Sequence, residues 1–140
     1  TSQTTIRGTP AILLWPLTWM NLSGGSVLAA RDFYKLDLTD ILVICDDFQL
    51  PLNTIRMRLS GSAGGQKGLA DTIARLSSTA IPRLRVGIGP VPKHQDAPSF
   101  VLGKFTKYEQ SDLNETIHRA ADAAESWVTL GIEPTMNRYN

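Results

Sequence analysis

A short apolar run, ILVIC at residues 41–45, constrains the fold more than any other stretch of this chain. The run is rich in β-branched residues, has no polar alternation, and ends in the carboxylates of Asp46 and Asp47. These properties predict a strand that is buried on both faces, as in a parallel sheet covered by other elements.

Further strand and helix patterns alternate along the chain on both sides of this run. Additional strands are expected at Ala11–Trp15, Asn53–Ser60 and Arg83–Gly89. Helices are expected after an N-cap at Ser23, over Leu69–Leu76, and from the capping-box pair Thr106 and Glu109 to Gly131 and Pro134. The pattern predicts one α/β domain over residues 1–140, with a mixed, mostly parallel sheet flanked by helices.

The lengths of the apolar segments indicate the cellular compartment of the protein. The longest purely apolar run, Ala11–Trp15, is far shorter than the roughly 20 residues of a membrane helix. The N-terminus of the chain has no apolar region of the kind that signal peptides carry, so we expect a soluble, cytoplasmic protein with no membrane partner. The single cysteine, Cys45, cannot form an internal disulfide, and its apolar surroundings favour a packed side chain over a nucleophile.

Basic residues are concentrated in the middle of the chain, although the net charge is only +1. Seven Lys and Arg residues lie between Arg56 and Lys93, against one acid, Asp71. Lysines and arginines gathered around glycines are typical of a surface that meets a phosphate backbone. A solvated surface on which basic residues happen to cluster is the alternative.

The glycine-rich stretch GSAGGQKGLADTIARL, Gly61–Leu76, runs into a predicted helix. It does not fit the nucleotide loop G-x-x-x-x-G-K-S/T, because Gly68 follows Lys67 where the hydroxyl residue belongs. A second candidate, GIGPVP, fails the dinucleotide pattern because Pro92 occupies the third glycine position. Two interpretations stay open: a helix start that accepts an anion, and a tight turn that packs the helix on the sheet.

Polar side chains near predicted strand ends are candidates for chemistry. Asp46 could orient a base or a water, or could simply cap a turn. Asn21 offers an amide that can hold a carbonyl, although asparagine is also an ordinary capping residue. Of the two histidines, His118 is expected to be a surface or packing residue of a helix, and His94 lies in a Pro-rich loop from which it could reach a crevice, although no partner fixes it. No Cys/His spacing fits a structural zinc site.

Six segments in order resemble the bacterial-type peptidyl-tRNA hydrolase family. They are PLTWMNLSG, VICDDFQLPL, RLSGSAGGQKGL, RLRVGIG, FVLGKF and MNRYN, which span about Ala11 to Asn140. The resemblance implies an enzyme that hydrolyses the ester between the peptide and the 3′ ribose of tRNA and so recycles tRNA. It also implies a monomer that needs no metal or other cofactor and whose partner is the acceptor end of peptidyl-tRNA.

The resemblance also assigns roles to individual residues. Met20 and Asn21 match a pair that borders the catalytic pocket and contacts the peptide, and Asp46 matches the aspartate that orients the catalytic histidine. The glycine loop, with Gln66 and Lys67, matches the family's G-G-H-N-G-L loop, which grips the CCA end. Two further residues, Arg58 and Arg85, match basic positions that bear on tRNA phosphates.

The chain departs from the family's pattern at two places. Gln66 and Lys67 replace the family's His-Asn pair, and they preserve hydrogen bonding and add a positive charge. In addition, Thr1–Pro10 shows no likeness to the family's first strand or to the T-R-H-N stretch that bears the general base. We therefore expect an N-terminally truncated domain whose missing part includes a strand and that histidine. The alternative is a non-catalytic RNA-binding relative of the same fold.

Overall fold

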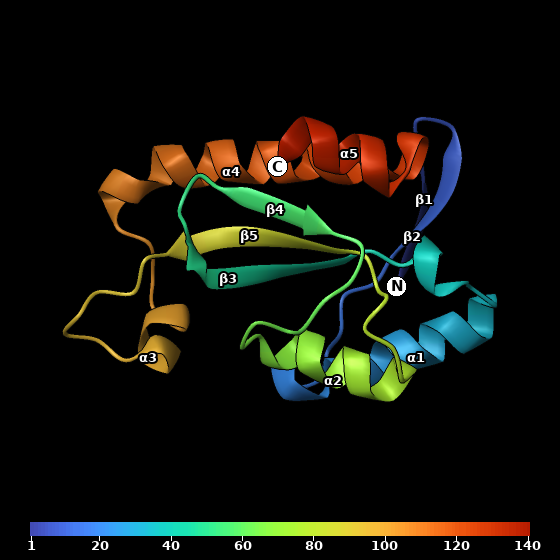
Figure 1. Ribbon diagram of the computed structural model, residues 1–140, viewed down its shortest axis with the longest axis horizontal. Helices are drawn as coiled ribbons and strands as arrows, with labels where there is room; N and C mark the ends of the chain where they lie inside the picture. Colours follow the sequence, from blue (N-terminus) through green and yellow to red (C-terminus); the bar gives the residue numbers. More distant parts are fainter.

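A three-stranded sheet lies between two helical layers in the computed structural model, which describes all 140 residues (Figure 1). The strands are β3 (Val43–Pro51), β4 (Ile55–Arg58) and β5 (Arg83–Gly89). Their order is β3-β5-β4, with β3 parallel and β4 antiparallel to β5. The predicted α/β class and the flanking helices are confirmed.

The sheet is mixed, as predicted, but it is not mostly parallel. One of its two pairings is parallel and the other is antiparallel. The reason is the short connection at residues 52–54, which turns the chain back so that β4 runs opposite to β3. Since β5 then enters between them, it must run parallel to one neighbour and antiparallel to the other.

One face of the sheet is covered by α4 (Gln110–Leu130) and α5 (Ile132–Tyr139). The core beneath them contains Ile55, Met57 and Leu84 from the sheet, packed against Ala120 and Ala123 of α4. The predicted capping box of Thr106 and Glu109 is present, in the short 3₁₀ turn (η3, Lys107–Glu109) that leads into α4.

The predicted stop at Gly131 ends α4, but the chain then continues into α5, which was not predicted. Gly131 has φ +86°, a conformation that glycine adopts without steric cost. Pro134 does not prevent a new helix, because it lies in the first turn of α5, where its missing N–H would have no helical partner. The side chain of Asn140, just after α5, bonds both the N–H and the carbonyl of Met57 on the edge strand β4, at 2.7 and 2.9 Å.

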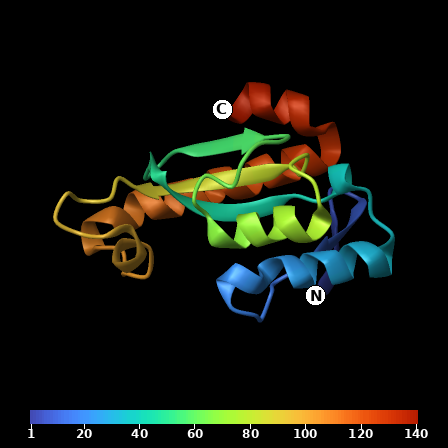
Figure 2. The same cartoon turned by 60° about the horizontal axis from the view of Figure 1, so that its bottom comes forward.

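The opposite face of the sheet carries α2 (Lys67–Leu76), with α1 (Ser23–Tyr34) beside it, as Figure 2 shows. Leu69 and Leu76 are the buried apolar residues of α2. Gly24 lets α1 approach α2 closely, and its N–H donates to the Asp71 carboxylate at 2.8 Å. The predicted N-cap at Ser23 is displaced by one residue, because Ser23 is already the first residue of the helix.

A hairpin of β1 (Ser2–Ile6) and β2 (Thr9–Leu13) forms a separate two-stranded antiparallel sheet. The strand predicted at residues 11–15 therefore starts earlier and ends at Leu13, and none of its residues is fully buried, with Leu13 itself 55% exposed. The apolar run was a poor guide here because no element covers the outer side of the hairpin.

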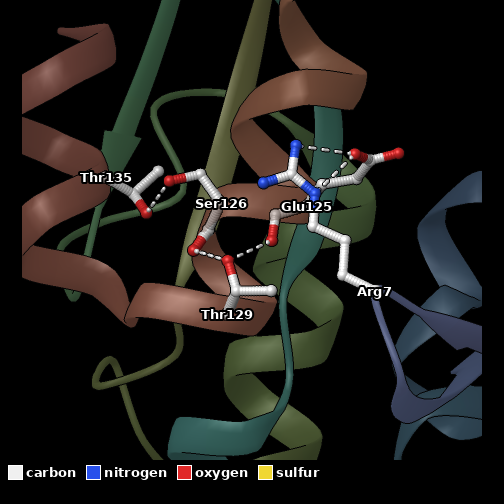
Figure 3. A network of polar contacts seen from close by, with 5 residues as sticks. All are labelled: Arg7, Glu125, Ser126, Thr129 and Thr135. Carbon is white, nitrogen blue, oxygen red and sulfur yellow. Dashed lines mark hydrogen bonds and ion pairs between the residues drawn. The ribbon is translucent and has the colours of Figure 1, made fainter.

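A network of polar contacts joins the hairpin and α5 to α4 (Figure 3). Arg7, at the hairpin turn, pairs with Glu125 of α4 at 3.1 Å. The hydroxyls of Ser126 and Thr135, which are buried between α4 and α5, are 3.0 Å apart and share a hydrogen bond. The remaining short helices are α3 (Ala97–Val101) and the 3₁₀ turns η1 (Met20–Leu22) and η2 (Leu38–Asp40). Every helix in the chain is too short or too polar to cross a membrane.

Candidate functional site

The side chain of Gln66 contacts two other predicted site residues, Asp46 and Met20, at the start of α2. Its Nε2 donates to Asp46 Oδ1 at 3.1 Å and lies 3.5 Å from the sulfur of Met20. Its Oε1 accepts from the backbone N–H of Leu69 at 2.7 Å, so that Gln66 is the N-cap of α2. The structure therefore places Asp46, from β3, against the end of the glycine loop, as the sequence predicted.

Arg83 fixes the glycine loop, residues 61–66, to the sheet. Its side chain is fully buried and donates to four backbone carbonyls: Gly61, Ser62, Thr79 and Ile81. Burial, followed by the like charge of Arg85, lowers the pKa of Arg83. An arginine still keeps its proton at neutral pH, so its guanidinium supplies charge-assisted hydrogen bonds to the loop.

Arg85 lies against the same loop, two residues further along β5. It donates to the Ser62 carbonyl at 2.9 Å and pairs with the buried carboxylate of Asp47 at 3.7 Å. A side chain at Gly64 would meet this guanidinium at 3.1 Å, and Gly64 also has φ +60°. Both the backbone conformation and the close approach of Arg85 therefore favour glycine there.

Four arginines share one face of the β4–β5 ladder. Arg56 lies opposite Arg85, and Arg58 lies opposite Arg83, while the intervening Met57 and Leu84 point into the core beneath α4. Residues directly opposite each other on antiparallel strands project to the same side of the sheet. Arg83 and Arg85 form hydrogen bonds or ion pairs with other groups of the chain. In contrast, Arg56 and Arg58 make no ion pair, and the Arg58 side chain donates only to the carbonyl of Met57.

The glycine loop presents N–H groups that no protein atom accepts. The backbone N–H groups of residues 62–65 donate no hydrogen bond within the chain. Lys67 follows as the first residue of α2 and is exposed, without an acidic partner. A cation at a helix N-terminus opposes the helix dipole, so Lys67 adds to the positive potential of this end instead of neutralising it.

Asn21 lies beside this constellation in η1, between Met20 and Leu22. It is exposed, and its amide makes no hydrogen bond within the chain, so both its donors and its acceptor are free. Met20 contacts α2 closely, because a side chain at Gly68 would meet the Met20 sulfur at 2.5 Å. The site therefore combines a bonded carboxylate, a free amide and a sulfur at one end of α2.

Several other candidate groups do not join this site. Cys45 is half-buried, and burial, with the charge of Asp46 as the next cause, raises the pKa of its thiol from 9.0 to about 11, which makes it a poor nucleophile at neutral pH. His94 and His118 are exposed, and neither forms a hydrogen bond to Asp46. No group of three or more His, Cys, Asp or Glu side chains gathers as a metal site.

Arg83 was not predicted to be a structural anchor. It was counted only as one of the seven basic residues between Arg56 and Lys93. The signal that could have found it is the alternation RLR at residues 83–85, which puts Arg83 and Arg85 on one face of a strand whose other face bears Leu84.

Comparison with known proteins gives consistent results. A protein-family model described as "Peptidyl-tRNA hydrolase" matches residues 1–140. A peptidyl-tRNA hydrolase from Rhodopirellula baltica is 48% identical over 139 residues, which is 99% of this chain and 73% of the relative. One from Chlorobium phaeobacteroides is 49% identical over 136 residues, 97% of this chain and 72% of the relative.

Solved structures agree with the sequence matches. The crystal structure of peptidyl-tRNA hydrolase from Acinetobacter baumannii has a TM-score of 0.87 and 32% identity, covering 99% of this chain and 70% of that one. The family match begins at residue 1, so it extends about ten residues beyond the start at Ala11 that the six segments indicated. That the chain lacks a segment with the family's histidine stays a prediction.

Proposed function

This chain belongs to the peptidyl-tRNA hydrolase family, and from that membership we propose that it hydrolyses the ester between peptide and tRNA in peptidyl-tRNA. The reaction returns free tRNA to translation, so we place it in the cytoplasm. We further propose that the chain acts as a monomer, with the acceptor end of peptidyl-tRNA as its partner and without a metal.

The contact between Gln66 and Asp46 is the observation that carries this proposal. It brings the carboxylate of β3 to the glycine loop, where an RNA end and an ester could meet. Asp46 accepts this bond through Oδ1, and Oδ2 forms no hydrogen bond within the chain, so it is available to orient a base that activates water. The free amide of Asn21 is suited to hold the carbonyl oxygen as negative charge develops on it.

The glycine loop and its neighbours support binding of an RNA end. Four consecutive backbone N–H groups, at residues 62–65, have no acceptor in the chain. Lys67 and Arg58 add charges that no acid neutralises. Arg85 lies against the same loop, and part of its side chain is accessible, with 23% exposed. Together these groups can contact phosphates near the acceptor end, while Met20 borders the place of the peptide.

The general base is the weakest match to the family. Neither histidine of this chain bonds Asp46, and we infer that neither serves as the base. The same arrangement is also expected of the second candidate function, an RNA-binding relative that does not hydrolyse its ligand. The two functions make the same prediction for RNA affinity and opposite predictions for ester cleavage.

An assay with an N-blocked aminoacyl-tRNA separates the two functions. The chain is mixed with the labelled substrate, and release of the blocked amino acid is followed together with binding of the same tRNA. Cleavage that falls at least tenfold in Asp46→Asn supports the hydrolase. Tight binding with no cleavage supports the RNA-binding relative. Absence of both cleavage and salt-sensitive binding would overturn the proposed function.

A further inference from the structure

We propose that Gln66 is the positioning residue of this site: its amide holds Asp46 in one orientation and couples that carboxylate to the glycine loop. This inference rests on the proposed function only for its catalytic consequence. The family loop that the sequence resembles has histidine here, so the role of a glutamine must be derived from the contacts of this chain.

The orientation of the Gln66 amide is fixed by its own helix. Oε1 accepts from the Leu69 N–H at 2.7 Å, and only an acceptor atom can occupy that position. The Nε2 group must then face the other way, where it donates to Asp46 Oδ1 at 3.1 Å. One bond thus determines the other, and the side chain has no second arrangement that satisfies both partners.

The surroundings leave little room for Gln66 to move. Met20 also contacts the amide, with the sulfur 3.5 Å from Nε2, and a side chain at Gly68 would meet both Met20 and Gln66 Oε1. Because Gly68 has no side chain, the amide can be held between η1, α2 and β3. Such a clamp transmits the position of the loop to Asp46.

A glutamine gives this clamp a property that a histidine would lack. An amide does not titrate, whereas an unperturbed imidazole changes charge between about pH 5 and 8. The titratable and charged groups near the clamp are Asp46, Asp47 and Cys45 on β3, Arg85 on β5 and Lys67 on α2. The Gln66 side of the bond to Asp46 therefore does not change its charge with pH.

Two substitutions separate the contact to Asp46 from the capping of α2. Gln66→Ser keeps a side-chain oxygen that can cap the helix, but it is too short to reach Asp46. Gln66→Glu keeps the oxygen that accepts from Leu69 and places a carboxylate against Asp46. Gln66→Ser should melt within a few degrees of the unmodified chain, since the cap is retained, and Gln66→Glu should do so at a pH at which one of its two facing carboxyls is protonated.

The Asp46 carboxyl, followed by carbon-13 NMR during a pH titration of the full chain, reports the contact directly. In Gln66→Glu, the two carboxyls should titrate as a coupled pair, with one apparent pKa raised well above that of an isolated carboxyl. An RNA hairpin ending in single-stranded CCA should shift the Asp46 signal in the unmodified chain and not in Gln66→Ser. Titration curves that overlay in all three proteins, or equal RNA-induced shifts, would overturn the proposal.

Hydrolysis supplies the catalytic arm of the test. Gln66→Ser should lower kcat by about 10-fold to 100-fold with a much smaller change in KM, because a misplaced Asp46 affects the reacting geometry more than binding. The activity of Gln66→Glu should fall as pH rises through the raised pKa of the pair, because the introduced carboxyl then loses the proton that it donates to Asp46. If NMR shows the contact and kcat does not change, the positioning role is refuted. If the unmodified chain neither cleaves the substrate nor binds the RNA, the proposed function fails, and the NMR titration of Gln66→Glu still decides the clamp.

Discussion

Replacing Arg83 with methionine tests whether a buried arginine holds the glycine loop. The guanidinium donates to four carbonyls, and two of these have a second donor: Thr79 accepts from the Gly61 N–H at 3.2 Å, and Ser62 accepts from Arg85 at 2.9 Å. The carbonyls of Gly61 and Ile81 accept no other hydrogen bond. Arg83→Met therefore leaves two acceptors without a partner.

The expected loss of stability follows from those two acceptors. A buried carbonyl without a donor costs about 1–3 kcal/mol, which gives a range of about 2–6 kcal/mol for the pair. The lower part of that range, about 2–4 kcal/mol, is expected, because the Gly61 carbonyl is only partly buried and can turn to water. Methionine also removes the cost of burying the guanidinium charge, which offsets part of the loss.

Urea denaturation followed by tryptophan fluorescence measures this change, since Trp127 packs against the core. Arg58→Met is the matched control, because Arg58 lies directly opposite Arg83 on β4 and bonds only the adjacent Met57 carbonyl. We expect the control to change the free energy of unfolding by less than about 1 kcal/mol, or to raise it slightly by removing a facing like charge. Equal effects of the two substitutions, or a loss below about 1 kcal/mol for Arg83→Met, would refute the anchoring role.

Three further predictions concern RNA binding, pH and helix packing. Arg58→Ala should weaken binding of an acceptor-stem RNA and make the negative slope of log affinity against log salt shallower by about one unit. An unchanged slope would show that Arg58 is not in the interface. Because the folded-state pKa of Cys45 is raised, its contribution to stability is complete below pH 9.0 and is lost as pH rises to about 11, so the unmodified chain should lose stability relative to Cys45→Ala across that window. Gly24→Ala should destabilise by about 1–3 kcal/mol, because its new methyl group would collide with the Asp71 carbonyl. Gly25→Ala, with no atom within 4 Å of its methyl group, should be neutral or stabilising by up to about 1 kcal/mol, and a similar loss in both variants would contradict the packing argument.

The elements of the fold that the sequence predicted well are those with a local signal. The period-two pattern at Arg83–Gly89 and the capping box at Thr106 depend only on residues close in sequence, and both occur in the structure. The hairpin at the N-terminus was missed because its first strand, SQTTI, has no apolar alternation. The pairing of β5 between β3 and β4 also could not be derived, because strand order depends on contacts between distant segments.

The candidate site was also only partly predictable from the sequence. The family resemblance predicts that Asp46 and Gln66 belong to the same site, and their hydrogen bond is consistent with that grouping. It could not distinguish an arginine that faces an RNA from one that holds a loop. That distinction depends on where the carbonyls of Gly61 and Ser62 point, more than 20 residues before Arg83. The tRNA roles of Arg58 and Arg85 stay predictions.

The bond from Asn140 to Met57 affects how the sheet meets other molecules. β4 is an edge strand, and an edge with free N–H and carbonyl groups is a template for self-association. Here one primary amide occupies both backbone groups of a central residue of the strand, as a neighbouring chain would. A further strand could pair with this edge only after displacing the Asn140 amide. The residue that follows α5 therefore opposes edge-to-edge aggregation of the sheet.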